Sequence, residues 1–155
     1  MTIHISTAPC CWGVDDVKNP FLPPWRRVLR EAAEAGYRGI ELGPYGYLPL
    51  DPDVVSKALD EHHLHVVAGT IFDDLVNPAN LPALLHQTHH ICALLKQLPS
   101  VKKETRQRFS GPYLVIMDWG HEERDYAAGH SDRAPRLDDA TWNEMLEHIR
   151  AIAEI

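Results

Sequence analysis

The sequence has no long hydrophobic run and a deficit of basic side chains. Its longest apolar stretches, such as residues 113–117, fall far short of the roughly 18 residues that cross a bilayer, so no membrane span is predicted. The chain carries 15 Lys and Arg against 22 Asp and Glu, a formal net charge of -7. This acidic balance disfavours nucleic acid and anionic membrane surfaces as partners, because both are themselves negatively charged.

Cysteines and targeting signals are equally scarce. There are three cysteines, two of them adjacent at Cys10 and Cys11, and their odd number and spacing do not match a disulfide framework. The first residues show no basic segment followed by an apolar one, so no secretion signal is predicted. These absences favour a cytoplasmic protein with reduced thiols.

Nucleotide-binding motifs are also missing. No Gly-x-Gly-x-x-Gly follows the first expected strand, and no Gly-Lys-Ser/Thr occurs anywhere, so the usual phosphate cradles are absent. What is present is ordinary globular composition, with 45% hydrophobic and 24% charged residues in a chain of 155. We therefore expect one domain over residues 1–155.

Strand and helix patterns alternate four times along the chain. Period-two alternation or continuous apolar runs predict strands at residues 3–7, 38–43, 64–72 and 113–117. Such alternation predicts an α/β fold with mainly parallel strands and with functional loops at their carboxyl ends.

The helices are predicted from apolar spacing and from start and stop signals. The first runs from Trp25 to a stop at Gly36, the second begins at an Asp51 N-cap, the third covers 81–95, and the last follows a capping box of Thr141 and Glu144. Residues 96–110 either extend the third helix or form a loop. Residues 121–137 are predicted to form a long polar loop.

Two architectures fit this alternation. Length favours a small open sheet, because a closed eight-unit barrel usually takes about 250 residues. The alternative is half of such a barrel, which would explain a last strand with an unpaired edge.

Two segments carry a resemblance to a known family. These are APCCWGV at residues 8–14 and EAAEAGYRGIELGP at residues 31–44. They resemble the opening of a xylose-isomerase-like barrel, in the sugar phosphate isomerase and epimerase superfamily. The Trp-Gly and Glu-Leu-Gly strand endings and the Asp51-Pro52 helix start are most similar to the inosose dehydratase branch. The resemblance covers the whole chain, but only the N-terminal half of the family's (β/α)8 TIM barrel.

The resemblance implies a metal-dependent isomerase, epimerase or dehydratase of a small sugar, sugar phosphate or keto-inositol. In that family a divalent metal, manganese, magnesium or cobalt, is bound by side chains from the second half of the barrel. This chain would then supply the substrate-pocket half and no metal ligand, its catalytic residues stay unassigned, and alone it would be inactive. Its expected partners are a small sugar or polyol and the rest of a barrel.

Four residues at expected strand ends are candidates for substrate binding: Trp12, Glu41, Trp119 and His121. An indole can cover the apolar face of a sugar ring, a carboxylate can orient a hydroxyl, and an imidazole can exchange a proton near neutral pH. Glu41 is equally consistent with a partly buried structural carboxylate. Cys10 and Cys11 are predicted to be packing residues, because no neighbouring base is evident.

Three histidines share the third expected helix: His86, His89 and His90. Their i, i+3 and i, i+4 spacing can place two imidazoles on one metal ion. A barrel helix lies outside the strands, away from the mouth, so surface or interface histidines are the expectation here.

Two other functions compete with an enzyme half. One is a non-catalytic half-barrel that closes by homodimerisation and serves as a binding or assembly module, since exposed sheet edges are seldom left uncovered. The other is an open flavodoxin-like binding domain. That fold requires a strand order that reverses about a switch point.

Overall fold

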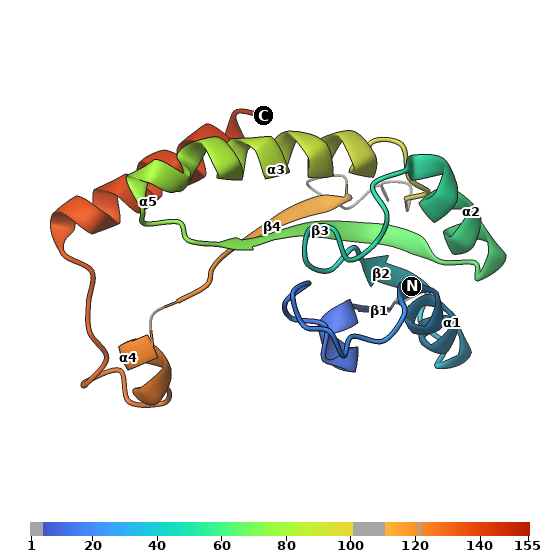
Figure 1. Ribbon diagram of the computed structural model, residues 1–155, viewed down its shortest axis with the longest axis horizontal. Helices are drawn as coiled ribbons and strands as arrows, with labels where there is room; N and C mark the ends of the chain where they lie inside the picture. The colour runs from blue at the N-terminus through green and yellow to red at the C-terminus, as the bar shows by residue number, and fades with distance from the viewer. Residues whose placement is uncertain (1–4, 101–110, 121) are drawn as a thin grey trace, which may run out of the picture.

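A computed structural model describes residues 5–100, 111–120 and 122–155. Its described elements form an α/β fold around one four-stranded parallel sheet (Figure 1). The strands are β1 (Ser6–Thr7), β2 (Gly39–Glu41), β3 (His65–Asp73) and β4 (Tyr113–Asp118). The fold class and the parallel pairing predicted from the sequence are confirmed.

The strands lie side by side in chain order, β1-β2-β3-β4. A flavodoxin-like sheet needs an order that reverses at a switch point, and the described strands show no reversal. The expectation of a flavodoxin-like domain is therefore wrong. Each strand is instead added on the same side of the one before it, as in the winding of a barrel.

The helices confirm most of the predicted pattern. They are α1 (Trp25–Glu34), α2 (Pro52–Glu61), α3 (Leu81–Leu95), α4 (Glu122–Tyr126) and α5 (Asp139–Ala153), with short 3-10 turns η1 (Pro9–Trp12) and η2 (Pro78–Asn80). Asp51 caps α2 as predicted, since its carboxylate accepts from the amides of Asp53 and Val54. α3 ends at Leu95, so the alternative that it continues into the polar residues beyond is wrong.

Two predictions about the C-terminal region are corrected. Asp138, not Thr141, caps α5, and its side chain accepts from the Thr141 amide. The helix begins one turn earlier than predicted because Asp138 supplies the stronger acceptor. The polar loop after β4 contains the short helix α4, whose first turn carries three acidic side chains that suit a helix N-terminus. α4 lies away from the sheet (Figure 1).

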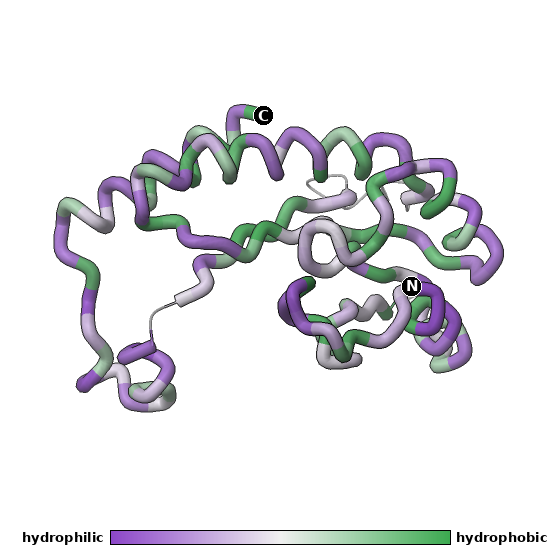
Figure 2. Tube along the Cα trace, in the orientation of Figure 1, coloured by the Kyte–Doolittle hydropathy of each residue, from purple (hydrophilic) through white to green (hydrophobic). Residues whose placement is uncertain are grey.

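One hydrophobic core joins the sheet to four of the helices. It contains buried residues from α1, α2, α3 and α5 together with Ile40, Val66 and Ile71 of the strands. Figure 2 shows that much of the hydrophobic colour lies along β3 and β4. α3 and α5 run side by side (Figure 1), and α3 packs on β3. Within the described part of the chain, no helix is long and apolar enough to span a membrane.

A buried histidine anchors helix α5 to the loop after β3 through a hydrogen bond. His148 is 1% exposed, and its Nδ1 lies 3.0 Å from the carbonyl oxygen of Leu75. Its Nε2 lies 3.1 Å from Oε1 of Glu144, one turn earlier on α5. Glu144 thus lies beside His148, whereas the sequence predicted that it would form a capping box with Thr141.

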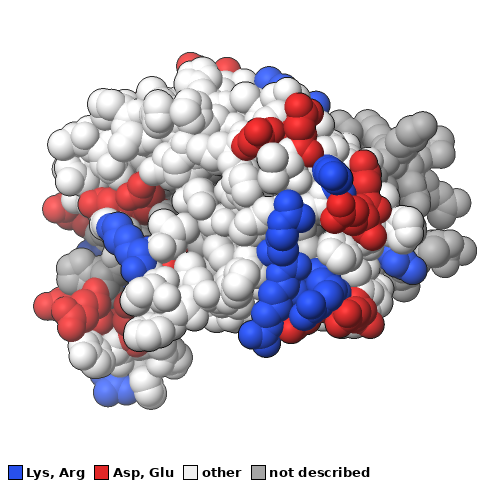
Figure 3. Space-filling view, turned by 45° about the vertical axis from the view of Figure 1, so that its right-hand side comes forward, with Lys and Arg blue, Asp and Glu red and all other residues white. Residues whose placement is uncertain are grey.

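The outer surface of α1 carries opposite charges close together. Arg27 Nε lies 2.7 Å from Glu31 Oε1, and Arg30 Nε lies 3.7 Å from Glu34 Oε1. Figure 3, which brings the side of α1 and α2 forward, shows basic groups flanked by acidic ones. The basic side chains on this face therefore do not form a patch of a single sign.

Candidate functional site at the carboxyl edge of the sheet

Two neighbouring hollows lie where the parallel strands end. The smaller has a volume of about 290 Å³ and the larger about 370 Å³, and Asp15, Pro44 and Phe72 line both. The loops after β1 and β2 and the last residues of β3 and β4 contribute to their walls. This is the edge at which parallel α/β proteins bind ligands, because the carboxyl ends of all the strands meet there.

Glu41 lines the smaller hollow from the end of β2. The register between β2 and β3 shifts at this point, so that Glu41 pairs with Ala68. Thr70, two residues further along β3 and therefore on the same face as Ala68, donates its hydroxyl to Glu41 Oε2 at 3.3 Å. This single neutral partner orients the Glu41 carboxylate while leaving acceptor capacity for a hydroxyl in the hollow.

Two thiols follow β1, and their environments differ. Cys10 lines the smaller hollow, and burial raises its pKa. In this structure the buried Thr7 Oγ1 has no hydrogen-bond partner among the described residues. When Cys11 ionises, the Thr7 hydroxyl can donate to the thiolate. This donor is the largest of the influences that lower the pKa of Cys11. Cys11, not Cys10, is therefore the thiol that ionises more readily.

Trp119 lines the larger hollow together with several polar side chains. It is 55% exposed and follows the end of β4, and Lys18, Asp73 and Gln87 belong to the same lining. A half-exposed indole beside hydrogen-bonding groups is suited to the mixed polar and apolar faces of a sugar ring.

Two aspartates at strand ends are occupied in holding loops. Asp73 accepts from Gln87 Nε2 at 2.7 Å and from Asn80 Nδ2 at 3.1 Å. Asp118, its register partner on β4, accepts from the amides of Leu75 and Gly120. These bonds fix the loops that follow β3 and β4 and use much of the acceptor capacity of both carboxylates.

Of the four predicted substrate-binding residues, two line the hollows, one points elsewhere and one is not described. Glu41 and Trp119 line the two neighbouring hollows. Trp12 instead turns toward α1, where its indole Nε1 donates to Glu31 Oε2 at 2.8 Å. His121 lies outside the described residues. No ligand tests any of the four, so their roles stay predictions.

Sequence reasoning missed several residues that line the hollows: Asp15, Thr70, Phe72 and Met117. A signal for three of them was available. Phe72 and Met117 pair in register, and Thr70 lies two residues before Phe72, so all three share one face of the sheet. Asp15 belongs to a loop without regular period, and its position depends on how that loop folds back over the sheet.

The described residues do not contain a group of three or more His, Cys, Asp or Glu side chains placed to hold a metal ion. Lone carboxylates such as Glu41 are too few to bind a divalent cation tightly, because such sites usually need several oxygen ligands.

No protein-family model and no curated protein sequence matched the chain. The fold and the hollows together define the chain as an α/β domain with a four-stranded parallel sheet and a concave carboxyl edge.

Proposed function

We propose that this chain supplies the substrate-pocket half of a (β/α)8 barrel enzyme. The observation that carries the proposal is the chain-order parallel sheet with its polar hollows at the carboxyl edge. In a TIM barrel successive strands are neighbours in chain order, the helices lie outside, and substrates bind at the carboxyl ends of the strands.

The face of the sheet turned away from α3 supports this reading. Phe72, Tyr113 and Met117 share that face and are between 44% and 48% exposed, whereas Ile71, on the opposite face, is fully buried. Large apolar side chains on the inner face of a closed barrel are normally packed in layers against the remaining strands. Their exposure here indicates a surface that a complete barrel would cover.

The proposed activity is that of a metal-dependent isomerase, epimerase or dehydratase acting on a small sugar, sugar phosphate or keto-inositol. Glu41 would accept a hydrogen bond from a substrate hydroxyl, and Trp119 would cover an apolar ring face. A divalent metal, manganese, magnesium or cobalt, would polarise substrate oxygens when bound. Its ligands would come from the half of the barrel that this chain does not supply, so we expect no turnover by the chain alone.

Ligand binding tests the pocket independently of turnover. We would titrate the isotope-labelled chain with xylose, fructose, fructose 6-phosphate and myo-inositol and follow amide and indole signals by NMR. The expected result is a saturable shift of the Trp119 indole and of the Thr70 amide with at least one of these compounds. Glu41→Gln should weaken that binding, because it removes the charge that strengthens a hydrogen bond to a hydroxyl.

A matched control is available on α5. Trp142 is 50% exposed and lies far along the chain from the strand ends, so Trp142→Phe should leave the titration unchanged whereas Trp119→Phe weakens it. Shifts confined to other surfaces, or no shift with any compound, would contradict a sugar pocket at this edge.

A second candidate function is a non-catalytic half-barrel that closes by pairing with another copy. Among the described residues, β1 and β4 each have only one neighbouring strand, which leaves both edges of the sheet without a strand partner. Two copies joined edge to edge would supply eight strands and cover the exposed apolar face. The mass of the particle in solution distinguishes this module from the enzyme half.

A further inference from the structure

Helix α3 carries two exposed histidines one turn apart, outside the hollows described above. His86 and His90 are related by i, i+4, which places both side chains on one face of the helix. Their ring centroids lie 4.2 Å apart, with the ring planes inclined at 49°. The two imidazoles therefore already share one small region of the surface.

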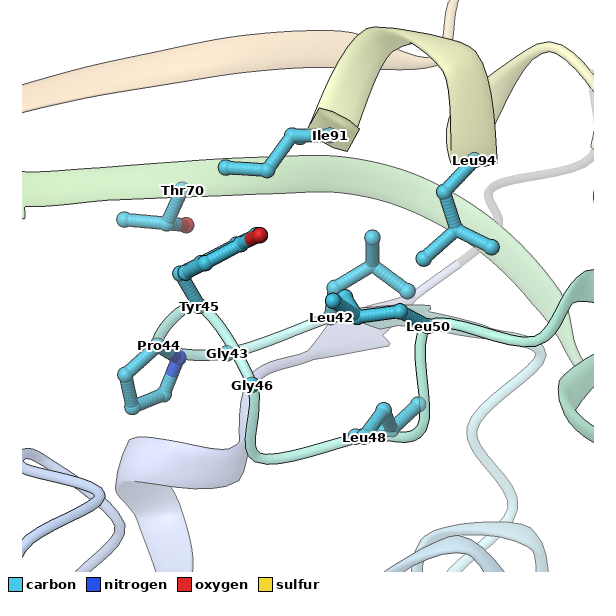
Figure 4. Close-up of a pocket in the computed structure, with 10 residues that line it drawn as sticks. All are labelled: Leu42, Gly43, Pro44, Tyr45, Gly46, Leu48, Leu50, Thr70, Ile91 and Leu94. Atoms are coloured by element: carbon cyan, nitrogen blue, oxygen red, sulfur yellow. The ribbon is translucent and has the colours of Figure 1, made fainter. Parts of the chain in front are cut away.

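Tyr45 holds one of these rings from another element. Its hydroxyl lies 2.7 Å from Nδ1 of His90, across a sequence separation of 45 residues. The Tyr45 ring belongs to the loop after β2, which packs beside Leu42, Ile91 and Leu94 around a small pocket (Figure 4). Because that loop is anchored against the helix, the hydroxyl restrains the His90 ring and leaves Nε2 as the nitrogen available to a ligand.

This arrangement matches a recurrent feature of metal-binding histidines. In such sites the nitrogen that does not bind the ion usually donates to an oxygen, which fixes the tautomer and the ring orientation. Here His90 Nδ1–H would donate to the Tyr45 hydroxyl oxygen, and the lone pair would lie on Nε2.

We propose that His86 and His90, with Tyr45 as the orienting group, form a surface site for a borderline transition-metal ion, with Zn²⁺ as the probe. Two nitrogens on a tetrahedral zinc ion are about 3.3 Å apart, given Zn–N bonds of about 2.05 Å. The ring centroids lie farther from the ion than the bound nitrogens do, so the two rings must open somewhat from their present centroid separation of 4.2 Å, which their exposure allows. Water would complete the coordination, so the ion would exchange readily.

This site is independent of the metal implied for a complete barrel. Its ligands lie on the helix, and imidazole donors favour zinc, copper or nickel, whereas carboxylate and water sites favour magnesium or manganese. Loss of the proposed enzymatic function would therefore leave this inference intact.

The test is a calorimetric titration of the chelator-treated full chain with zinc chloride. We expect one ion per chain. Tyr45→Phe removes only the orienting bond and should weaken binding about tenfold, the lower end of what losing such a partner costs. His86→Ala and His90→Ala each remove a ligand and should weaken binding more than Tyr45→Phe does. Far-ultraviolet circular dichroism would check that each variant is folded.

Two controls separate this pair from other zinc ligands. His89→Ala removes an exposed histidine of the same helix and should not change the affinity. Cys10→Ser/Cys11→Ser removes the two exposed thiols, which are zinc ligands by type, and this variant should likewise retain the site. As a direct readout, the imidazole nitrogen signals of His86 and His90 should shift together on zinc addition. The proposal is overturned if zinc binds equally well to His86→Ala and His90→Ala, or if only the cysteine variant loses binding.

Discussion

At the scale of single residues, the carboxylates at the carboxyl edge of the sheet are of two kinds. Some are engaged in hydrogen bonds that hold loops, and others keep acceptor capacity for a ligand. Asp73 and Asp118 stand at strand ends, the positions where catalytic carboxylates are expected in a barrel, yet both are engaged with loop amides or side-chain amides. Glu41 has one hydroxyl partner and faces a hollow. Hydrogen-bond partners, more than position on a strand, therefore distinguish Glu41 from the other two strand-end carboxylates.

The two adjacent thiols should differ in reactivity. Cys11 has a lowered pKa, chiefly through Thr7, and Cys10 has a raised pKa through burial, so at pH 7 to 8 a larger fraction of Cys11 is thiolate. We expect iodoacetamide to modify Cys11 several-fold faster than Cys10, as measured by peptide mass spectrometry over time. Thr7→Val removes the donor, so it should slow the modification of Cys11 and leave the modification rate of Cys10 unchanged. Equal rates for the two cysteines in the unmodified chain would show that the donor has no effect.

At the scale of elements, α3 sits closely on β3 because one strand position lacks a side chain. A Cβ added at Gly69 would lie 2.4 Å from Cγ2 of Ile91 and 3.3 Å from Cδ1 of Leu95. The first of these distances is well inside van der Waals contact, so helix and strand could not keep their present separation. The sequence pattern of the strand does not reveal this requirement, since the clashing partner is on another element.

Gly69→Ala should therefore destabilise the protein by about 1–3 kcal/mol, the usual cost of overpacking a core. Urea denaturation followed by circular dichroism would measure the loss. Ile91→Ala in the same chain removes the clashing methyl group, so the double variant should be more stable than the sum of the two single losses implies. Strict additivity would mean that the close approach of α3 to β3 is not what Gly69 provides.

The start of α5 should depend on pH through its capping aspartate. Hydrogen bonds from the Thr141 amide lower the pKa of Asp138 below its ordinary value. A carboxyl with a depressed folded pKa stabilises the folded state at pH values above its unfolded pKa, and this contribution is lost as the pH falls through the lower folded pKa. We expect the Thr141 amide signal to titrate with a midpoint below 3.8, the ordinary value for this group.

Asp138→Asn provides the matched control for that titration. Asparagine keeps a side-chain oxygen that can accept from Thr141, but it does not ionise in this range. The Thr141 signal should then be nearly independent of pH between 2 and 5. A titration that persists in this variant would assign the effect to another group near α5.

At the scale of the whole molecule, one face of the sheet is covered by helices and the other is partly exposed near the carboxyl ends of β3 and β4. The core fills the space between the sheet and the helices, whereas Phe72, Tyr113 and Met117 remain partly exposed on the other side. Large apolar side chains exposed on one face of a sheet are typical of an interface. The proposed barrel and the proposed pairing of two copies both account for it, and they differ in what covers the face.

Light scattering distinguishes the proposed pairing of two copies from the proposed half of a barrel enzyme. If copies pair, the 17.5 kDa chain should give a particle of twice that mass, and Phe72→Asp/Met117→Lys should return it to the monomer mass. Trp142→Asp, which alters an exposed aromatic on α5, should leave the dimer intact. A monomer at all concentrations would eliminate the homodimeric module and leave the enzyme half as the remaining proposal.

Much of the local structure followed from the sequence because its causes are local. Asp51 and Pro52 fixed the start of α2, and the apolar period of residues 81–95 matched α3 from end to end. The start of α5 was missed because two capping candidates lie three residues apart, and only the backbone decided in favour of Asp138. The candidate site was partly predictable: strand-end position brought Glu41 and Trp119 to the hollows but did not exclude Trp12.

The sequence by itself determined the alternation of strands and helices, the α/β class and the start of α2 at its capping residue. These features depend on interactions between residues that are close in the sequence, so local propensity and periodicity are enough to predict them. Tertiary structure alone decided the strand order, the partner of Trp12, the bond between Thr70 and Glu41 and the anchoring of α5 by His148. Thr70 and Glu41 are 29 residues apart, and His148 and Leu75 are 73 apart. Such pairings follow from how the layers pack, because burial and hydrogen bonding between distant segments are settled only when the whole core forms.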